Sequence, residues 1–195
     1  MHKRTLFLKK LTDRLFKNGA KEMTGRARGI RLRETIERIL REEKETLIVL
    51  DFSGTGSVDF SWADEVVAKI VSRLWGTEYG EHFLVLKGLS PSQTENIGVA
   101  LERKKLAALT VSPTGWQIVG QLNNYLIQTL NRVMKKKRLT LKELSEVEGI
   151  EMNTSGTRLL NLYKKRLVIR LEGASDLYKP ISQRGRQYVY QSLLS

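Results

Sequence analysis

Two runs of four apolar residues place the strongest constraint on the fold of this chain. Residues 47–50 read Leu-Ile-Val-Leu and residues 83–86 read Phe-Leu-Val-Leu. Uninterrupted apolar runs of this length are typical of strands that are buried on both faces, as in a parallel sheet. Between them, over residues 58–74, the apolar residues recur at helical spacing instead. Strand, helix and strand in this order predict an α/β unit with a parallel sheet.

The flanking segments continue the same alternation. Helical spacing also occurs over residues 30–43. Ser90 and Pro91 predict the start of a further helix, with the serine as N-cap and the proline in the first turn. Shorter strands are predicted at residues 5–11 and 108–111. The expected fold of this part is a small, mostly parallel sheet with helices, and we place its end after residue 115, where Ser-Pro-Thr-Gly interrupts the pattern.

The remainder, residues 116–195, is expected to be a mainly α domain. A long helix is predicted over residues 121–136. Thr140 and Glu143 form a capping box for a second helix, which Gly149 ends. A third helix is predicted next, with Asn153 or Thr154 as its N-cap. The end of the chain is predicted to form strands at residues 167–171 and 177–181 and a helix at residues 182–194.

Positive charge is concentrated in this second half. The formal net charge is +13, and residues 120–195 carry +8 of it. An excess of this size favours a polyanionic partner, because phosphate neutralisation releases counterions. A basic protein without such a partner is the alternative on charge alone. No apolar run approaches the roughly 20 residues of a membrane span, and no secretory signal is visible, so we expect a cytoplasmic protein without membrane contact.

The first apolar run ends in Asp51, with Gly54 and Gly56 close behind. An aspartate and glycines after a strand also begin the motifs that bind adenosylmethionine or dinucleotides. The glycine spacing here differs from those motifs, and the second run ends in Lys87 where an acidic residue would hold ribose hydroxyls. We therefore expect the glycines to turn the chain into the next helix, and we expect no cofactor and no enzymatic activity.

Few other residues suit catalysis or metal binding. The chain has no cysteine and only two histidines, which argues against a metal site and a catalytic triad. Asp59, Asp64 and Glu65 lie close together, but near a predicted helix start, where the helix dipole favours acidic residues in any protein. We expect these three to have no catalytic role.

Residues 59–65 read Asp-Phe-Ser-Trp-Ala-Asp-Glu and follow a buried strand and a loop. This run resembles the STAS-like family, relatives of bacterial anti-sigma-factor antagonists, and the resemblance covers residues 26–111. In the antagonists a serine at this helix start is phosphorylated to switch partner binding. That position corresponds to Phe60 here, so the resemblance leaves Ser61, next to it, as the candidate for phosphorylation or a partner switch. The other interpretation is that Ser61 is an ordinary N-cap.

A second resemblance rests on residues 141–144 (Leu-Lys-Glu-Leu), Gly149-Ile150, residues 157–163 (Thr-Arg-Leu-Leu-Asn-Leu-Tyr) and Leu167-Val168. Together they resemble the winged helix-turn-helix domains of MarR-like transcription regulators, over residues 121–195. The resemblance implies that residues 157–163 belong to a recognition helix that lies in the major groove of double-stranded DNA.

The residues of that helix suit base recognition. Leu159, Leu160 and Tyr163 form an apolar stripe, whereas Arg158, Asn161 and Lys165 recur on another face at helical spacing. Arg158 suits a bidentate contact with guanine, and Asn161 one with adenine. The other predicted DNA-binding residues lie near the helix, in the basic run before Leu139 or on the strands of the wing: Thr154, Ser155, Thr157, Lys164, Lys136, Lys137, Arg138, Arg170 and Lys179.

These features leave two functions open. One is a DNA-binding transcriptional regulator, expected as a homodimer, whose STAS-like domain binds a protein partner, a small ligand or a second copy. The apolar residues of the helix at residues 121–136 would serve as a dimer seam or as the link between the domains. The alternative is a protein-interaction adaptor of a regulatory or defence pathway without DNA binding, which two acidic residues at the expected wing tip, Glu172 and Asp176, favour.

Overall fold

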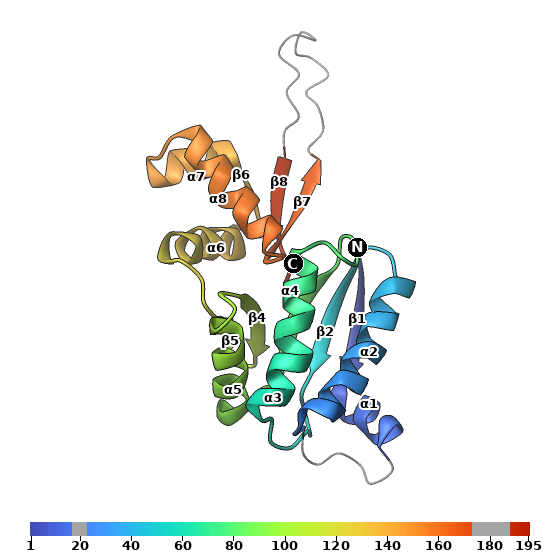
Figure 1. Ribbon diagram of the computed structural model, residues 1–195. Helices are drawn as coiled ribbons and strands as arrows, with labels where there is room; N and C mark the ends of the chain where they lie inside the picture. The colour runs from blue at the N-terminus through green and yellow to red at the C-terminus, as the bar shows by residue number, and fades with distance from the viewer. Residues whose placement is uncertain (17–22, 173–187) are drawn as a thin grey trace. The chain divides into compact units, whose positions relative to one another are not determined.

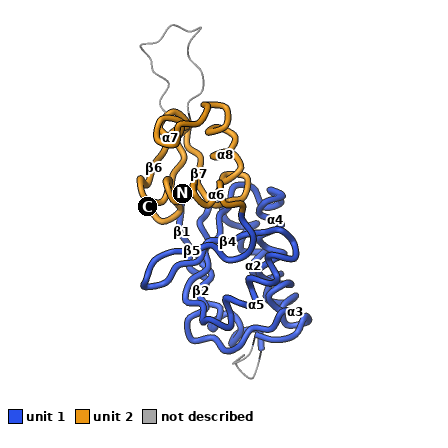
Figure 2. Tube along the Cα trace, turned by 90° about the vertical axis from the view of Figure 1, so that its left-hand side faces the viewer, with its two compact units in different colours: residues 1–122 blue, residues 123–195 orange. Residues whose placement is uncertain are grey.

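The computed structural model describes residues 1–16, 23–172 and 188–195, which form two compact units, Met1–Leu122 and Asn123–Ser195 (Figure 2). The sequence predicted a boundary after residue 115. In the structure, residues 115–120 belong to the first unit, because they form a strand that pairs with the strand before it. The chain leaves this unit only after Leu122.

The first unit is built on a mostly parallel sheet, as predicted, and the sheet has five strands, of which the last was not predicted. Its strands lie in the order in which they occur in the chain: β1 (His2–Phe7), β2 (Thr46–Asp51), β3 (Phe83–Lys87), β4 (Ala107–Ser112) and β5 (Gly115–Gly120). The first four are parallel, and β5 returns antiparallel to β4. Right-handed crossovers between consecutive neighbours place all the connecting helices on the same face, and Figure 1 shows them in front of the sheet.

The helices of the first unit differ from the prediction at α1 and at a π-helical segment. They are α1 (Leu8–Leu15), α2 (Arg26–Glu42), α3 (Phe60–Ala63), the π-helical segment η1 (Asp64–Ala68), α4 (Lys69–Trp75) and α5 (Pro91–Glu102). The predicted strand at residues 5–11 was wrong in its second half, where α1 begins, because Leu8 and Thr12 lie one turn apart and share the buried face of a helix. The predicted cap of α5 is confirmed, with Ser90 and Gln93 forming a capping box.

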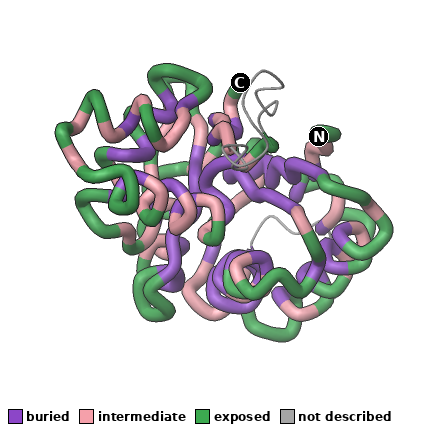
Figure 3. Tube along the Cα trace, turned by 90° about the horizontal axis from the view of Figure 1, so that it is seen from above, coloured by how far each residue is buried: buried purple, intermediate pink, exposed green. Residues whose placement is uncertain are grey.

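The core of the unit lies between the sheet and these helices. Alternate strand residues, among them Ile48, Leu50, Leu84 and Leu86, pack against Trp62 and its neighbours in one apolar cluster. Figure 3 marks the buried positions along the chain. The strand residues that alternate with those of the cluster, Leu47, Val49, Phe83 and Val85, are buried as well. Both faces of β2 and β3 are therefore buried, as the uninterrupted apolar runs predicted.

The helical rod from Phe60 to Trp75 contains a π-helical turn where the sequence predicted a regular helix. All five residues of η1 are buried, including the carboxylates of Asp64 and Glu65. All sides of η1 are covered because it packs against both α2 and α5. Gly29 of α2 allows the two helices to approach closely here, because an added Cβ would lie 3.0 Å from Cβ of Glu65.

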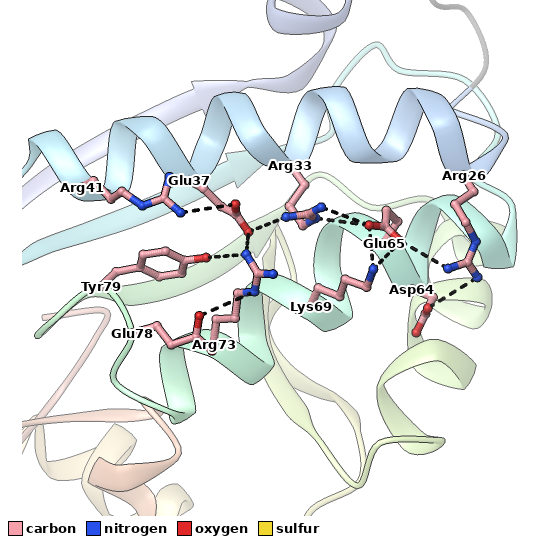
Figure 4. A network of polar contacts seen from close by, with 10 residues as sticks. All are labelled: Arg26, Arg33, Glu37, Arg41, Asp64, Glu65, Lys69, Arg73, Glu78 and Tyr79. Atoms are coloured by element: carbon pink, nitrogen blue, oxygen red, sulfur yellow. Dashed lines mark hydrogen bonds and ion pairs between the residues drawn. The ribbon is translucent and has the colours of Figure 1, made fainter.

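Buried ion pairs connect this rod to α2 (Figure 4). Glu65, 1% exposed, lies 3.2 Å from Nη2 of Arg33, 2.7 Å from Nζ of Lys69 and 3.3 Å from Nη1 of Arg26. Arg33 also bonds Glu37, at 2.8 Å, so one guanidinium joins the two carboxylates. Burial alone would raise the pKa of Glu37, but hydrogen bonds from Arg33 and Tyr79 outweigh it and lower that pKa.

The described residues of the second unit form three helices and a three-stranded antiparallel sheet. Along the chain they are α6 (Asn124–Lys136), β6 (Arg138–Thr140), α7 (Leu141–Glu148), α8 (Met152–Lys164), β7 (Val168–Glu172) and β8 (Tyr188–Ser192), and the strand order is β6-β8-β7. The α6 residues Leu126, Leu130 and Met134 are buried, and α6 packs against α8, β6 and β8. The apolar stripe of α6 therefore belongs to the interior and is not exposed as a dimer seam.

The sequence predicted a helix over residues 182–194, and this prediction was wrong for residues 188–192. Residues 182–187 lie outside the described residues. Residues 188–192 form β8, in which Tyr190 pairs with both Leu139 of β6 and Arg170 of β7. The aromatic and β-branched sequence Tyr-Val-Tyr suits a strand. The returning strand predicted at residues 177–181 lies outside the described residues.

At the helix boundaries of the second unit, some of the predicted caps are confirmed and others are wrong. The capping box of Thr140 and Glu143 is confirmed, and so is Gly149 as the C-cap of α7, with φ of 62°. The predicted caps of α8, Asn153 and Thr154, were wrong. The N-cap is Glu151, without a side-chain hydrogen bond, because α8 begins at Met152.

The capping box makes a testable contribution to stability. Hydrogen bonds from the Thr140 backbone and side chain lower the pKa of Glu143. A carboxylate whose pKa is lowered on folding stabilises the native state above its unfolded pKa and loses that effect as pH falls through its folded pKa. Thr140→Ala should therefore cost about 1 kcal/mol near neutral pH and less in acid, as measured by urea unfolding followed by circular dichroism. Glu146→Gln, a change at an exposed carboxylate of the same helix, is the control, and an equal cost at both pH values would contradict the role of Glu143.

Candidate nucleic-acid interface

The outer side of α8 bears an open groove whose lining residues, except for one tyrosine, have hydroxyl, amide or guanidinium side chains. Asn153, Thr154 and Thr157 are exposed, and Arg158 and Asn161 are partly exposed. The groove has a volume of about 370 Å³ and is lined by Tyr125, Asn153, Thr154, Thr157, Arg158 and Asn161. Four of the predicted DNA-binding residues thus lie together: Thr154, Thr157, Arg158 and Asn161. The groove has hydroxyl, amide and guanidinium groups, which can hydrogen-bond to base edges or phosphates.

Tyr125 is a groove residue that the sequence analysis missed. It lies on α6, some 30 positions before Arg158, and its side chain is 40% exposed. The only local signal is that it stands beside the buried stripe of α6, next to Leu126. Its ring lies 5.4 Å from the guanidinium carbon of Arg158, close enough for a cation–π contact.

Arg158 is also paired with an acidic residue, Glu148, which contacts a second arginine as well. Its Nη1 donates to Oε2 of Glu148 at 3.0 Å, and Oε1 of Glu148 lies 3.6 Å from Nε of Arg132. One carboxylate is thus shared by two guanidinium groups, which leaves the three residues with a net positive charge. Because a guanidinium has five N–H donors and Glu148 accepts from Nη1, Arg158 retains donors for another acceptor.

Ser155 does not lie on the polar face, contrary to the prediction. It is fully buried, on the same side of α8 as Leu159 and Leu162, at i+4 and i+7. Within the described part of the chain its Oγ has no hydrogen-bond partner. Ser155 therefore cannot contact DNA in this conformation.

The two lysines at the end of α8 have different environments. Lys164 is exposed, whereas Lys165 is only partly exposed, and burial lowers the pKa of its ammonium group. Lys165 follows the last residue of α8 and is its C-cap, so it no longer continues the face of Arg158 and Asn161. Of this pair, only Lys164 presents a fully solvated charge.

The basic run before Leu139 is separate from the groove. Lys136, Lys137 and Arg138 are exposed at the C-terminal end of α6 and the start of β6. Tyr125 lies near the opposite end of α6, so at 1.5 Å per residue roughly 16 Å of helix separates it from Lys136. Arg138 donates from Nε to the side chain of Gln191, and Lys136 lies 3.9 Å from Glu143. The run therefore forms a second basic surface.

Arg170, predicted as a wing contact, is held between aromatic rings. Its guanidinium carbon lies 4.5 Å from the ring centre of Tyr163 and 4.4 Å from that of Tyr188. This stack joins the end of α8 to β7 and β8. Lys179 and the acidic residue Asp176 lie outside the described residues.

The interpretation of Ser61 as the N-cap of its helix was wrong. It lies in the first turn of α3, partly exposed, and the N-cap is Asp59. The Asp59 carboxylate accepts from the backbone of Trp62 at 2.7 Å and of Gly25 at 2.8 Å, so it joins two segments of the chain. Whether Ser61 accepts a phosphate stays a prediction.

Polar groups at the end of β2 and in the loop after it form hydrogen bonds with Gln93 of α5 and Lys87 of β3. The side-chain amide of Gln93 donates to Oγ1 of Thr55 at 3.0 Å and to the carbonyl of Gly56 at 2.6 Å. Asp51 accepts from the backbone of Ser53 at 2.9 Å and from Nζ of Lys87 at 3.0 Å. These bonds outweigh the effect of burial and lower the pKa of Asp51. The aspartate at the end of β2 is therefore bound to the neighbouring strand.

Residues 1–16, 23–172 and 188–195 contain no cluster of three or more histidine, aspartate or glutamate side chains suited to a metal ion. None of the helices in this part of the chain is both long enough and apolar enough to cross a membrane. Comparison of the sequence with protein-family models and with curated proteins finds no match.

Proposed function

We propose that the chain is a DNA-binding regulator whose second unit is a winged helix-turn-helix. The order of α6, β6, α7, α8, β7 and β8 supports this, because that fold has a helix, a short strand, two further helices and a two-stranded wing. Gly149, in the left-handed conformation, makes the turn between α7 and α8. In this proposal α8 is the recognition helix.

The observation that carries the proposal is the groove on α8. Arg158 and Asn161 lie one turn apart on its wall, with the exposed hydroxyls of Thr154 and Thr157 beside them. An arginine reads guanine through O6 and N7, and an asparagine reads adenine through N6 and N7. Exposed basic residues outside the groove, Lys164, Lys136 and Lys137, would contact backbone phosphates.

Selection of bound sequences from a random pool of duplex DNA tests this proposal directly. We expect an enriched motif, bound with a dissociation constant below about 1 µM. If about four cations contact phosphates, affinity should fall roughly 100-fold between about 50 and 200 mM salt. Single-stranded DNA of the same sequence is the control, and a pool that remains random after selection would contradict sequence-specific binding.

The first unit is proposed to be a STAS-like regulatory domain that binds a partner, a ligand or a second copy. A mostly parallel sheet with its helices on one face is compatible with this proposal. A homodimer is part of it, since paired half-sites raise affinity without new kinds of contact. Sedimentation with and without the selected duplex would measure the stoichiometry, and an inverted-repeat motif bound by a single chain would contradict the dimer.

One observation favours the alternative, a protein-interaction adaptor. Arg158 is already paired with Glu148 and covered on one side by Tyr125, which lowers its attraction for DNA. An adaptor would give no shifted band with mixed genomic fragments at low or moderate salt. A band that persists at moderate salt would argue against it.

A further inference from the structure

A second groove lies in the first unit, where β1, α1 and α2 meet. Its volume is about 410 Å³, and it is lined by Arg4, Thr5, Leu6, Phe7, Lys10, Leu11, Arg14, Leu15, Thr35, Arg38 and Ile39. β1 is the edge strand of the sheet, and the lining residues come from β1, α1 and α2. It shares no residue with the loop after β2 or with Ser61.

The floor of the groove is apolar. Leu11, Leu15 and Ile39 pack against the main core of the unit while remaining partly exposed. Phe7, at the end of β1, is 46% exposed. Partly uncovered aliphatic and aromatic side chains gathered around one hollow provide a surface on which an apolar group would lose contact with water.

The rim carries charge of one sign. Arg4, Lys10, Arg14 and Arg38 all line the groove, and none of its other lining residues among those that the structure describes is acidic. Arg4 is paired with Glu43, and Lys10 lies over the ring of Phe7 at 5.1 Å. Arg14 and Arg38 are exposed and form no ion pair within the described part of the chain. Two guanidinium groups are therefore available beside the apolar floor.

Single exposed arginines are usually just solvated, and cations on an edge strand also prevent sheet-to-sheet association. Those explanations account for Arg4 on β1. They do not account for Arg14 and Arg38, which come from α1 and α2 and border the same apolar hollow. Guanidinium groups bind carboxylates through paired hydrogen bonds.

From this arrangement we infer that the groove binds a small organic anion with an apolar body, such as a medium-chain carboxylate. The hydrocarbon part lies on Leu11, Leu15 and Ile39, and the carboxylate meets Arg14 and Arg38. The volume is within the roughly 300–1,000 Å³ of small-molecule sites. This site is the ligand site of the first unit, and its existence does not depend on DNA binding by the second.

Isothermal titration calorimetry of the full chain with decanoate tests the inference. We expect saturable binding of one decanoate per chain. Decyltrimethylammonium, which has the same tail and the opposite charge, should bind at least about tenfold more weakly. Arg14→Gln/Arg38→Gln should weaken decanoate binding about fivefold, because each exposed charge pair contributes modestly.

The matched control is Lys44→Gln/Lys135→Gln, which removes the same charge at exposed positions outside the groove and should leave binding unchanged. Thr35→Trp, which fills the groove from α2, should abolish binding of decanoate. No saturable binding at millimolar decanoate would overturn the inference, and so would equal affinity for the two amphiphiles or unchanged binding by both groove variants. DNA binding of each variant, measured in parallel, separates this outcome from failure of the proposed function.

Discussion

Glu65→Ala is expected to destabilise the first unit by about 3–5 kcal/mol, the usual cost of removing one partner of a buried ion pair. Glu65 is 1% exposed and contacts Arg33, Lys69 and Arg26. Its removal leaves the buried guanidinium of Arg33 with Glu37 alone. The variant keeps the Arg26–Asp64 pair, at 3.9 Å, but loses the contacts of Arg26 and Arg33 with Glu65 that also join α2 to the π-helical segment (Figure 4).

Urea unfolding followed by tryptophan fluorescence measures this change in one unit only. All three tryptophans, Trp62, Trp75 and Trp116, belong to Met1–Leu122, so the signal does not include unfolding of the second unit. Glu34→Ala, at an exposed position of α2, is the matched control and should change stability by less than about 0.5 kcal/mol. A midpoint for Glu65→Ala within error of the unsubstituted protein would show that the ion pairs of this carboxylate do not stabilise the fold.

The second large effect is expected on DNA recognition. In the proposed function, Arg158→Ala/Asn161→Ala removes two bidentate base contacts, each worth about 1–3 kcal/mol of discrimination. Preference for the selected motif over a scrambled duplex should therefore fall at least roughly 30-fold. Non-specific attraction should survive, because only one positive charge is lost, and the salt slope should decrease by about one unit or less. Fluorescence anisotropy with both duplexes at several salt concentrations measures the two quantities separately.

A matched pair of variants distinguishes base reading from phosphate contact. Lys136→Gln/Lys137→Gln removes charge from the basic surface at the far end of α6 and should weaken binding to both duplexes equally. Full discrimination by the Arg158 and Asn161 double variant would show that α8 is not the recognition helix. Circular dichroism should first establish that this variant keeps its helices, since Arg158 pairs with Glu148 of α7.

Patterns within a few residues determined much of the local structure. The apolar runs at residues 47–50 and 83–86 predicted β2 and β3, and their alternation with helical segments predicted the parallel sheet. The N-cap at Ser90 and the capping box of Thr140 and Glu143 could be predicted because the hydrogen bonds of a cap join residues about three positions apart. Gly149 was readable because its left-handed conformation suits glycine.

Other features depended on contacts between elements that are remote in the sequence, and patterns within one segment did not predict them. The pairing of Arg33 with Glu65 joins two helices 32 positions apart in the sequence, and Tyr125 reaches the groove on α8 because α6 packs beside it. Ser155 looked like a member of the polar face, but its exposure was decided by how α8 rotates against its neighbours. Many strands and helices, the caps at Ser90, Thr140 and Gly149, and the excess of positive charge could be predicted from the sequence, because they follow from local backbone preference and composition. Burial, ion pairing and the two grooves were decided by the tertiary structure, because each depends on distances between residues that are remote along the chain.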